Sequence, residues 1–406
     1  MKIINDSSFQ KKGFDYRLII IGLLIVCFLI LLFSEFSYGS YVVLGKYLGI
    51  NPIPYFIDLK ILLCGIDAIR LEEDPYKAIC VDGKPFFNYP IIWGTFSIFP
   101  FLTVKNTVYI GGIIAVSFIS SVYLFIGKLK FFDAIIYSCF LLSPAVLLGI
   151  ERGNCDLVIF LFVLLAMYVG QKKQLFFTIL IFTASVLKIF PIAALIGIFF
   201  LRSKDSFKKS VIIFGIAISL FVIYFLAYRQ NFLIVSQTTP RPFAGQSYGL
   251  GSIPGFLSSK FPIIRSFAYP TFLCILMTCF YFFYKFYTKI FDRFSIVKEP
   301  IGLQFIIGNS IFLLTCFIGF NAEYRLVFLL LCVPQLLQWY KVETIKYANY
   351  LLFGTIFITW QSFFSDVLRI PMYHYFNQLI VVIMFFSYLA ILIKVFFKYI
   401  NINKIK

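Results

Sequence analysis

The chain has 406 residues, of which 61% are hydrophobic and 13% are charged. Soluble domains average about 45–50% apolar and about 25% charged residues, so the surplus apolar surface must face lipid. The formal net charge of +18 is distributed in short Lys and Arg clusters between apolar runs, without a basic face interleaved with aromatics, which argues against a nucleic-acid-binding protein.

Apolar segments follow one another along almost the whole chain. A helix that spans a bilayer needs about 20 residues. Segment 174–201 is too long for one span and carries Lys188 and Pro191 near its middle. Because proline breaks a helix and lysine is costly at the bilayer centre, we expect two short helices that meet near Lys188. The segments lie at about 18–33, 107–127, 132–150, 155–170, 174–201, 210–227, 267–287, 301–319, 325–340, 348–364 and 377–397.

This pattern predicts an all-α polytopic membrane protein with a single domain, 1–406, and about twelve membrane-spanning or re-entrant helices. Basic residues precede the first apolar run, but no small-residue cleavage site follows Phe33, so we expect a retained first helix rather than a signal peptide.

Most of the 36 Lys and Arg residues fall in short loops on the side of the N-terminus. The positive-inside rule then predicts cytoplasmic N- and C-termini.

Two long loops are predicted on the outer side. The first, 34–106, contains an apolar stretch at 89–102 that is short for a span and fits the membrane interface. The second, 228–266, is rich in Gly, Ser and Pro. Because the cytoplasmic loops are short and functional residues concentrate on loops, we expect the chemistry on the extracytoplasmic face of the plasma (inner) membrane.

Cysteine and histidine usage indicates no metal site. Most of the nine Cys lie inside apolar runs, where they act as small hydrophobic residues. No CxxC spacing is present, and the one His, His374, cannot hold a metal alone, so no metal or other cofactor is required by the sequence. Cys64 and Cys80 share the first long loop and can form a disulfide if that loop faces an oxidising compartment.

Asp58 is the first candidate catalytic residue. It lies among apolar residues of the first long loop, near a predicted membrane face, which suits a general base that takes a proton from a sugar hydroxyl. A helix N-cap or a solvated loop acid is the alternative interpretation. The acidic run 72–74 in the same loop is a solvated turn, or else a group that holds acceptor hydroxyls or a divalent cation.

Four cations fall on or toward the outer side, where Lys and Arg are the minority: Arg152, Lys188, Arg241 and Arg325. Guanidinium and ammonium groups stabilise a phosphate leaving group, so together these residues predict a site for a lipid-linked phosphate. Lys188 is the sharpest case, because ionisable groups inside apolar runs are functional candidates by default. For Arg152 the alternative is snorkelling to the interface, and for Arg325 a local ion pair.

These motifs occur in an order that resembles a known family. Asp58 is followed by Asp74-Pro75-Tyr76 and Tyr89-Pro90, then by Arg152-Gly153-Asn154 with Asp156, Leu187-Lys188-Ile189-Phe190-Pro191, and Asn321 to Arg325. From about residue 18 to 340, this order is similar to that of glycosyltransferase family 87, of the GT-C superfamily of polyprenyl-phosphate-sugar-dependent membrane enzymes. The chain departs from the family's Tyr-Pro-Pro motif, because Ile91 follows Pro90.

The resemblance implies a GT-C fold and an inverting transfer of a hexose, often mannose in the family, from a polyprenyl-phosphate donor to a lipid or glycan acceptor. Asp58 would be the general base on the acceptor hydroxyl. Arg152, Lys188 and Arg325 would hold the donor phosphate, joined by Arg241. The candidates that would line the acceptor side or shape the loops are Asp74, Tyr76, Tyr89, Asn154, Asp156, Glu323 and Tyr324.

Other classes fit parts of the pattern. A polymerase that joins lipid-linked glycans would share the topology, but it would rely on outer arginines and tolerate the loss of Asp58. A transporter or flippase of lipid-linked sugars predicts ionisable groups along a path through the bilayer midplane, and only Lys188 fits that path. Polar clusters in tight turns disfavour a purely structural scaffold.

Overall fold

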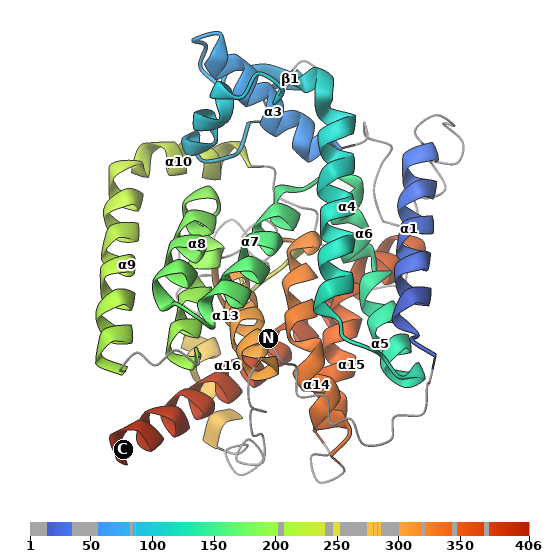
Figure 1. Ribbon diagram of the computed structural model, residues 1–406, viewed down its shortest axis with the longest axis vertical. Coiled ribbons are helices and arrows are strands. Elements are labelled where there is room, and N and C mark those ends of the chain that lie inside the picture. Colours follow the sequence, from blue (N-terminus) through green and yellow to red (C-terminus); the bar gives the residue numbers. More distant parts are fainter. Residues whose placement is uncertain are drawn as a thin grey trace.

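The computed structural model describes residues 14–34, 56–81, 84–85, 87–201, 207–239, 247–251, 274–278, 280–281, 283–285, 300–318, 321–342, 347–368 and 373–405. Within these ranges the regular structure is helical apart from two short antiparallel strand pairs (Figure 1). The predicted all-α class is therefore confirmed.

The helices and strands have the following bounds. The α-helices are α1 (Arg17–Ser34), α3 (Ile57–Arg70), α4 (Thr107–Phe125), α5 (Phe131–Leu141), α6 (Pro144–Glu151), α7 (Cys155–Gly170), α8 (Gln174–Leu187), α9 (Phe207–Ala227), α10 (Arg229–Thr238), α13 (Ile301–Ile318), α14 (Val333–Tyr340), α15 (Ala348–Thr359) and α16 (Tyr373–Ile405). The 3-10 helices are η1 (Ile91–Ile98), η2 (Val104–Asn106), η3 (Phe190–Phe200) and η5 (Glu323–Leu331), and η6 (Phe363–Val367) is a π-helix. The strands are β1 (Ile79–Val81), β2 (Lys84–Pro85), β3 (Ser247–Tyr248) and β4 (Asn321–Ala322).

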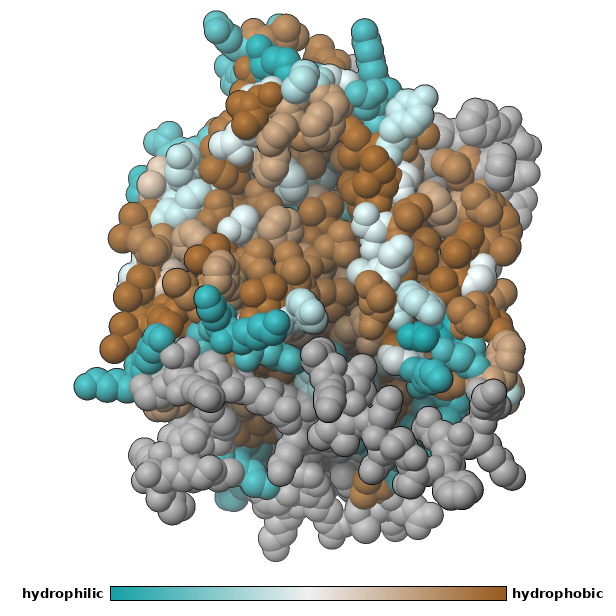
Figure 2. Space-filling model, viewed as in Figure 1, coloured by the Kyte–Doolittle hydropathy of each residue, from teal (hydrophilic) through white to brown (hydrophobic). Residues whose placement is uncertain are grey.

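Four helices in the described ranges are long and apolar enough to cross a membrane: Val104–Phe125, Phe207–Ala227, Ile301–Ile318 and Phe376–Lys398. The bent pair α5 and α6 makes a fifth if it forms one span. Figure 2 shows the matching surface, with an apolar band across the middle and hydrophilic residues above and below it. These are the features of an integral membrane protein. The count of about twelve passages stays a prediction, because other apolar helices, such as α7, α8 and α15, have only 10–17 residues.

The helices differ in how deeply they lie in the bundle. The apolar window of α13 is 72% buried and packs against η3, η5 and α16, whereas that of α9 is 17% buried. In Figure 1, α9 stands at the edge of the molecule and α13 within it. A helix that is apolar on all sides is stable in either position, because its outer face contacts lipid and its inner face contacts other helices.

Prolines interrupt three of the predicted segments. Segment 174–201 forms α8 and η3, with Lys188 in extended conformation between them, as predicted. Segment 132–150, predicted as one helix, is broken into α5 and α6, which are bent by 53°. Pro144 begins α6 and has no N–H to continue the α5 ladder. Segment 325–340 is likewise a 3-10 helix followed by α14, which has Pro334 in its first turn.

The first predicted outer loop contains a compact substructure. Helix α3 buries Leu59, Leu62, Leu63 and Ile66 on one face, the spacing of an amphipathic helix. Arg70 at its end donates to three backbone carbonyls of the following stretch, and Cys64 forms a disulfide with Cys80 of β1. The stretch predicted to lie along the interface, 89–102, forms the 3-10 helix η1, which packs on α3.

The second predicted outer loop is described in part. Its start forms α10, which lies at the same end of the molecule as α3 and β1 (Figure 1). Strand β3 pairs with β4, so that Tyr248 lies opposite Asn321. Arg241 lies outside the described residues, as does most of the predicted segment 267–287.

Candidate functional site

The start of α3 is fixed against the turn between α6 and α7. The backbone N–H of Phe56 donates to the carbonyl of Glu151 at 3.0 Å, and that of Leu59 donates to the carbonyl of Arg152 at 3.3 Å. Phe56 itself adopts a left-handed conformation with φ of 55°, which is unusual for a bulky residue and is typical of functional sites. These contacts place Asp58, in the first turn of α3, beside the Arg-Gly-Asn turn.

Two glycines make room for the ring of Phe56. A Cβ on Gly153 would lie 2.8 Å from this ring, and one on Gly111 of α4 would lie 2.4 Å from it. Gly153 also has φ of +56°, a conformation that a residue with a side chain rarely adopts. The glycine of the Arg-Gly-Asn motif is therefore needed both for backbone conformation and for close approach of α3.

Asp58 accepts hydrogen bonds from two residues of this turn. Arg152 Nη1 donates to Oδ1 at 3.1 Å and Asn154 Nδ2 donates to Oδ2 at 2.5 Å. Asn154 is also the N-cap of α7, because its Oδ1 accepts from the backbone N–H of Asp156 at 2.8 Å. Asp58 is therefore neither an N-cap nor a solvated loop acid. Its side chain is 12% exposed, which leaves an edge open to a small acceptor group.

Asp156 holds two of the predicted phosphate-binding cations. Its Oδ1 lies 2.7 Å from Lys188 Nζ, and its Oδ2 lies 3.6 Å from Arg325 Nε. The Asp156 side chain is 1% exposed, whereas those of Lys188 and Arg325 are 12% and 23% exposed. Since one carboxylate faces two cations, this trio carries one positive charge in excess on its more accessible side.

Tyr89 joins the Asp58 and Asp156 groups. Its hydroxyl donates to the backbone carbonyl of Asp58 at 3.2 Å, and its ring centroid lies 5.5 Å from Lys188 Nζ, a cation–π distance. Burial, with the neighbouring Cys155 and Asp58, raises the pKa of Tyr89 well above its usual value, so the hydroxyl stays a donor. The structure thus brings together residues of five separate segments around Asp58 and Asp156.

Arg152 remains charged in this setting. Burial alone would lower the pKa of Arg152, but the carboxylates of Asp58 and Glu151 outweigh it and raise the pKa above its usual value. Arg325 is held in turn by Asn321, whose Oδ1 accepts from its Nη1, and Asn321 donates to the Thr315 carbonyl. Both guanidinium groups are thereby fixed in position and keep their charge.

The remaining predicted residues differ in whether they contact the site. Glu323 is fully buried and accepts a hydrogen bond from Ser362, while the charges of Asp58 and Arg325 act on Tyr324. Tyr76 is connected to the site through Tyr89, to whose backbone carbonyl its hydroxyl donates at 3.2 Å.

Asp74 does not contact the site. Its side chain is 43% exposed, accepts from the backbone N–H of Tyr76 and pairs with Lys77 at 3.3 Å, as in a solvated turn. In the part of the chain that the structure describes, no group of three metal-ligating side chains is present.

Sequence reasoning missed several residues that position the site. Trp93 of η1 donates to the carbonyl of Leu187 at 3.1 Å and so fixes the first loop to the helix break at Lys188. The charge of Lys188 acts on the Cys155 thiol, and the Arg325 guanidinium lies 5.6 Å from the ring centroid of Phe190. The aromatic residues had no signal beyond hydrophobicity, since their partners are distant in sequence.

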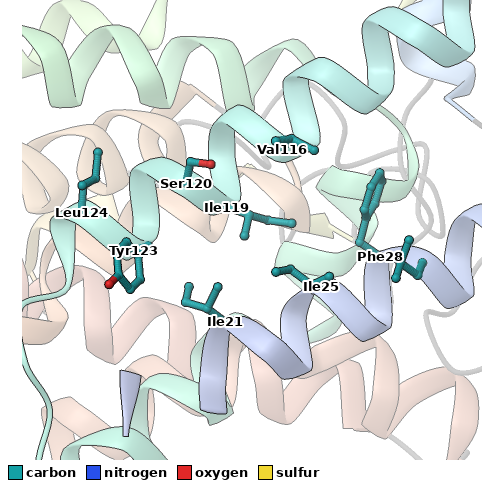
Figure 3. A pocket seen from close by; sticks show the side chains of 9 residues that line it. Ile21, Ile25, Phe28, Val116, Ile119, Ser120, Tyr123 and Leu124 are labelled. Carbon is teal, nitrogen blue, oxygen red and sulfur yellow. The ribbon is translucent and has the colours of Figure 1, made fainter. Parts of the chain in front are cut away.

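A separate apolar groove lies between α1 and α4. It has a volume of about 580 Å³ and is lined mainly by aliphatic and aromatic side chains, with the α1 residues facing those of α4 (Figure 3). No carboxylate or cation lines it, so it offers no acid–base chemistry and is distinct from the Asp58 and Asp156 site.

No protein-family model, curated protein or solved structure matches this chain.

Proposed function

We propose that this protein is a membrane glycosyltransferase of GT-C type that transfers a hexose, such as mannose, from a polyprenyl-phosphate donor to a lipid or glycan acceptor. In this proposal the chain has about twelve membrane-spanning or re-entrant helices. The site faces the extracytoplasmic side of the plasma membrane, and both termini are cytoplasmic.

The observation that carries the proposal is the pairing of two different groups in one site. Asp58 is an oriented, slightly exposed carboxylate, and next to it Asp156 holds Lys188 and Arg325 in a buried trio with excess positive charge. An acid that can act as a base beside cations that can hold an anion is the arrangement needed to displace a phosphate from a sugar.

The reaction would run as follows in terms of bonds. Asp58 accepts the proton of the acceptor hydroxyl while that oxygen forms a bond to the anomeric carbon of the sugar. The bond between the anomeric carbon and the phosphate oxygen breaks on the opposite face, which inverts the configuration. The electron pair leaves with the phosphate, whose negative charge Lys188 and Arg325 stabilise, while Arg152 and Asn154 orient the Asp58 carboxylate.

The test compares two aspartates of the same loop. Purified protein in proteoliposomes is given radiolabelled polyprenyl-phosphate hexoses and a lipid extract as acceptor. We expect Asp58→Asn to lower kcat by about 100- to 10,000-fold, the usual contribution of a general base. Asp74→Asn, the same chemical change at an exposed position, is the matched control and should transfer at the wild-type rate.

Each alternative has its own outcome. Equal transfer by wild type and Asp58→Asn would show that Asp58 is not the base and would favour a polymerase that depends on the arginines. Movement of the labelled donor across the liposome membrane without transfer would identify a flippase instead. Absence of both activities with every labelled hexose would overturn the proposal.

A further inference from the structure

A second polar cluster lies buried beside the site and has no role in the proposed chemistry. Ser362 donates to the carboxylate of Glu323, which is two residues from Arg325 in η5. Gln361, next to Ser362, accepts from the amide of Asn377 near the start of α16. All four side chains belong to residues that are 0–2% exposed, and the π-helix η6 follows directly after Ser362. Such π-helical turns are frequent at functional sites.

Two atoms of this cluster lack hydrogen-bond partners. Gln361 Nε2 is a free donor, and Asn377 Oδ1 is a free acceptor, although both are fully buried. Unpaired amide groups are costly inside a membrane protein, where no bulk water can satisfy them. A ligand group that supplies both an acceptor and a donor would satisfy the pair.

A hydroxyl group has this property. It can accept from Gln361 Nε2 and donate to Asn377 Oδ1 at the same time, whereas a cation or an anion would satisfy only one of the two atoms. The neighbouring Glu323 carboxylate is a further acceptor for hydroxyl protons. Because Gln361 and Ser362 are adjacent in the chain, these donors and acceptors belong to one buried cluster. Such a set of polar groups suits a compound with several hydroxyls, which is a sugar.

We infer that Gln361, Asn377, Ser362 and Glu323 form the subsite that recognises the sugar hydroxyls of the lipid-linked donor. This inference rests on the proposed function, since η5 connects the subsite to the phosphate-binding Arg325. It assigns the discrimination between hexoses to the start of η5, the residues between α15 and η6, and α16, and the binding of the phosphate to the Asp156 trio.

The test uses near-isosteric apolar substitutions and measures binding without turnover. The probes are a short isoprenyl phosphate and its mannose, glucose and galactose esters, titrated against protein in nanodiscs. We expect the wild type to bind at least one sugar ester more tightly than the sugar-free phosphate. The double variant Gln361→Met/Asn377→Leu should lose this preference, by about tenfold for a lost pair of hydrogen bonds, and bind the sugar-free phosphate as before.

A stability measurement separates recognition from structure. Because the double variant removes both unpaired atoms together with both partners of the hydrogen bond between Gln361 and Asn377, it should melt at the same temperature as the wild type or higher. Asn309→Leu is the matched control: Asn309 is equally buried and also has an unpaired Oδ1, but its substitution removes the donor to the Tyr388 carbonyl and leaves that carbonyl in place, at the contact of α13 with α16. This control should melt at a lower temperature and keep the sugar preference.

The outcomes also separate the subsite from the enzyme proposal. An unchanged sugar preference in the double variant, or no preference in the wild type, overturns the subsite and leaves a buried water as the occupant, even if Asp58-dependent transfer is found. Loss of the preference in the double variant supports the subsite, even if no transfer is detected and the enzyme proposal fails. The single variants Gln361→Met and Asn377→Leu apply the same criteria if the double variant is not obtained.

Discussion

At the scale of single residues, the site depends on one buried carboxylate, that of Asp156, which forms ion pairs with two cations. Asp156 is held in place by the Asn154 cap, and Lys188 and Arg325 reach it from a helix break and from a 3-10 helix. A buried ion pair adds little net stability against an apolar replacement, because desolvation opposes the attraction. Removing one partner is different, because it leaves an uncompensated charge in a buried position.

This asymmetry gives a stability prediction. Asp156→Asn leaves Lys188 and Arg325 facing each other without a counter-charge, and we expect it to cost about 3–5 kcal/mol of unfolding free energy. Lys188→Met should cost less, because Asp156 keeps Arg325 as its partner. Thermal unfolding of the purified variants in detergent would check the order. The double variant Asp156→Asn/Lys188→Met should melt above Asp156→Asn, because only one cation is then left without a counter-charge. An Asp156→Asn protein as stable as the wild type would contradict the assignment.

At the scale of secondary-structure elements, the position of α3 determines the position of Asp58. The helix is anchored at its start by the ring of Phe56, which lies against Gly153 of the α6–α7 turn and Gly111 of α4. At its middle, the Cys64–Cys80 disulfide ties it to β1. The α6–α7 turn and α4, which are far from α3 in sequence, and the nearby strand β1 therefore set the location of one carboxylate.

Neighbouring glycines of α4 provide a matched test of this anchoring. A Cβ at Gly111 would lie 2.4 Å from the Phe56 ring, whereas a Cβ at Gly112 would meet no atom within 4 Å. We expect Gly111→Ala to displace α3, to cost about 1–3 kcal/mol of stability and to reduce sugar transfer, as overpacked cores do. Gly112→Ala should be neutral or slightly stabilising, because alanine favours helices. Similar melting temperatures and activities for the two variants would rule out the anchoring role of Phe56.

At the scale of the whole molecule, the site lies at one end of the helix bundle. Helix α7 begins beside Asp58 and α8 ends at Lys188, so the turn that connects them, 171–173, lies at the opposite end. A helix of this length spans about 24 Å, most of the hydrocarbon core of a bilayer. Lys105, in η2 next to α3, and Lys172, in the α7–α8 turn, are both exposed and mark the two ends.

Thiol labelling at these two lysines tests the predicted orientation. We expect Lys105→Cys to react with a membrane-impermeant maleimide in intact cells, because the site end is predicted to be extracytoplasmic. Lys172→Cys should react only after the membrane is permeabilised. The parental protein provides the background from native thiols. The reverse labelling pattern would place the site on the cytoplasmic face and would contradict the positive-inside prediction.

Much of the candidate site could be predicted from sequence. Ionisable residues inside or beside apolar runs are rare, so the sequence alone identifies Asp58, Arg152, Lys188 and Arg325 as candidate site residues. The position of Asp74 in the same acidic loop gave a similar signal, yet it is exposed. Sequence patterns identify a charged residue near a membrane face, but they do not reveal whether its side chain is buried in the folded protein.

By itself, the sequence determined the membrane class, the helical architecture and the helix break at Lys188, because these follow from local hydrophobicity and proline geometry. Only the tertiary structure decided which charged residues form pairs. Asp58 pairs with Arg152, which lies 94 residues away in sequence, and Asp156 pairs with both Lys188 and Arg325. It also revealed the buried amides of Gln361 and Asn377. Such pairings depend on long-range packing, in which apolar helices of similar composition can meet in many ways, and hydrophobic pattern alone does not distinguish among them.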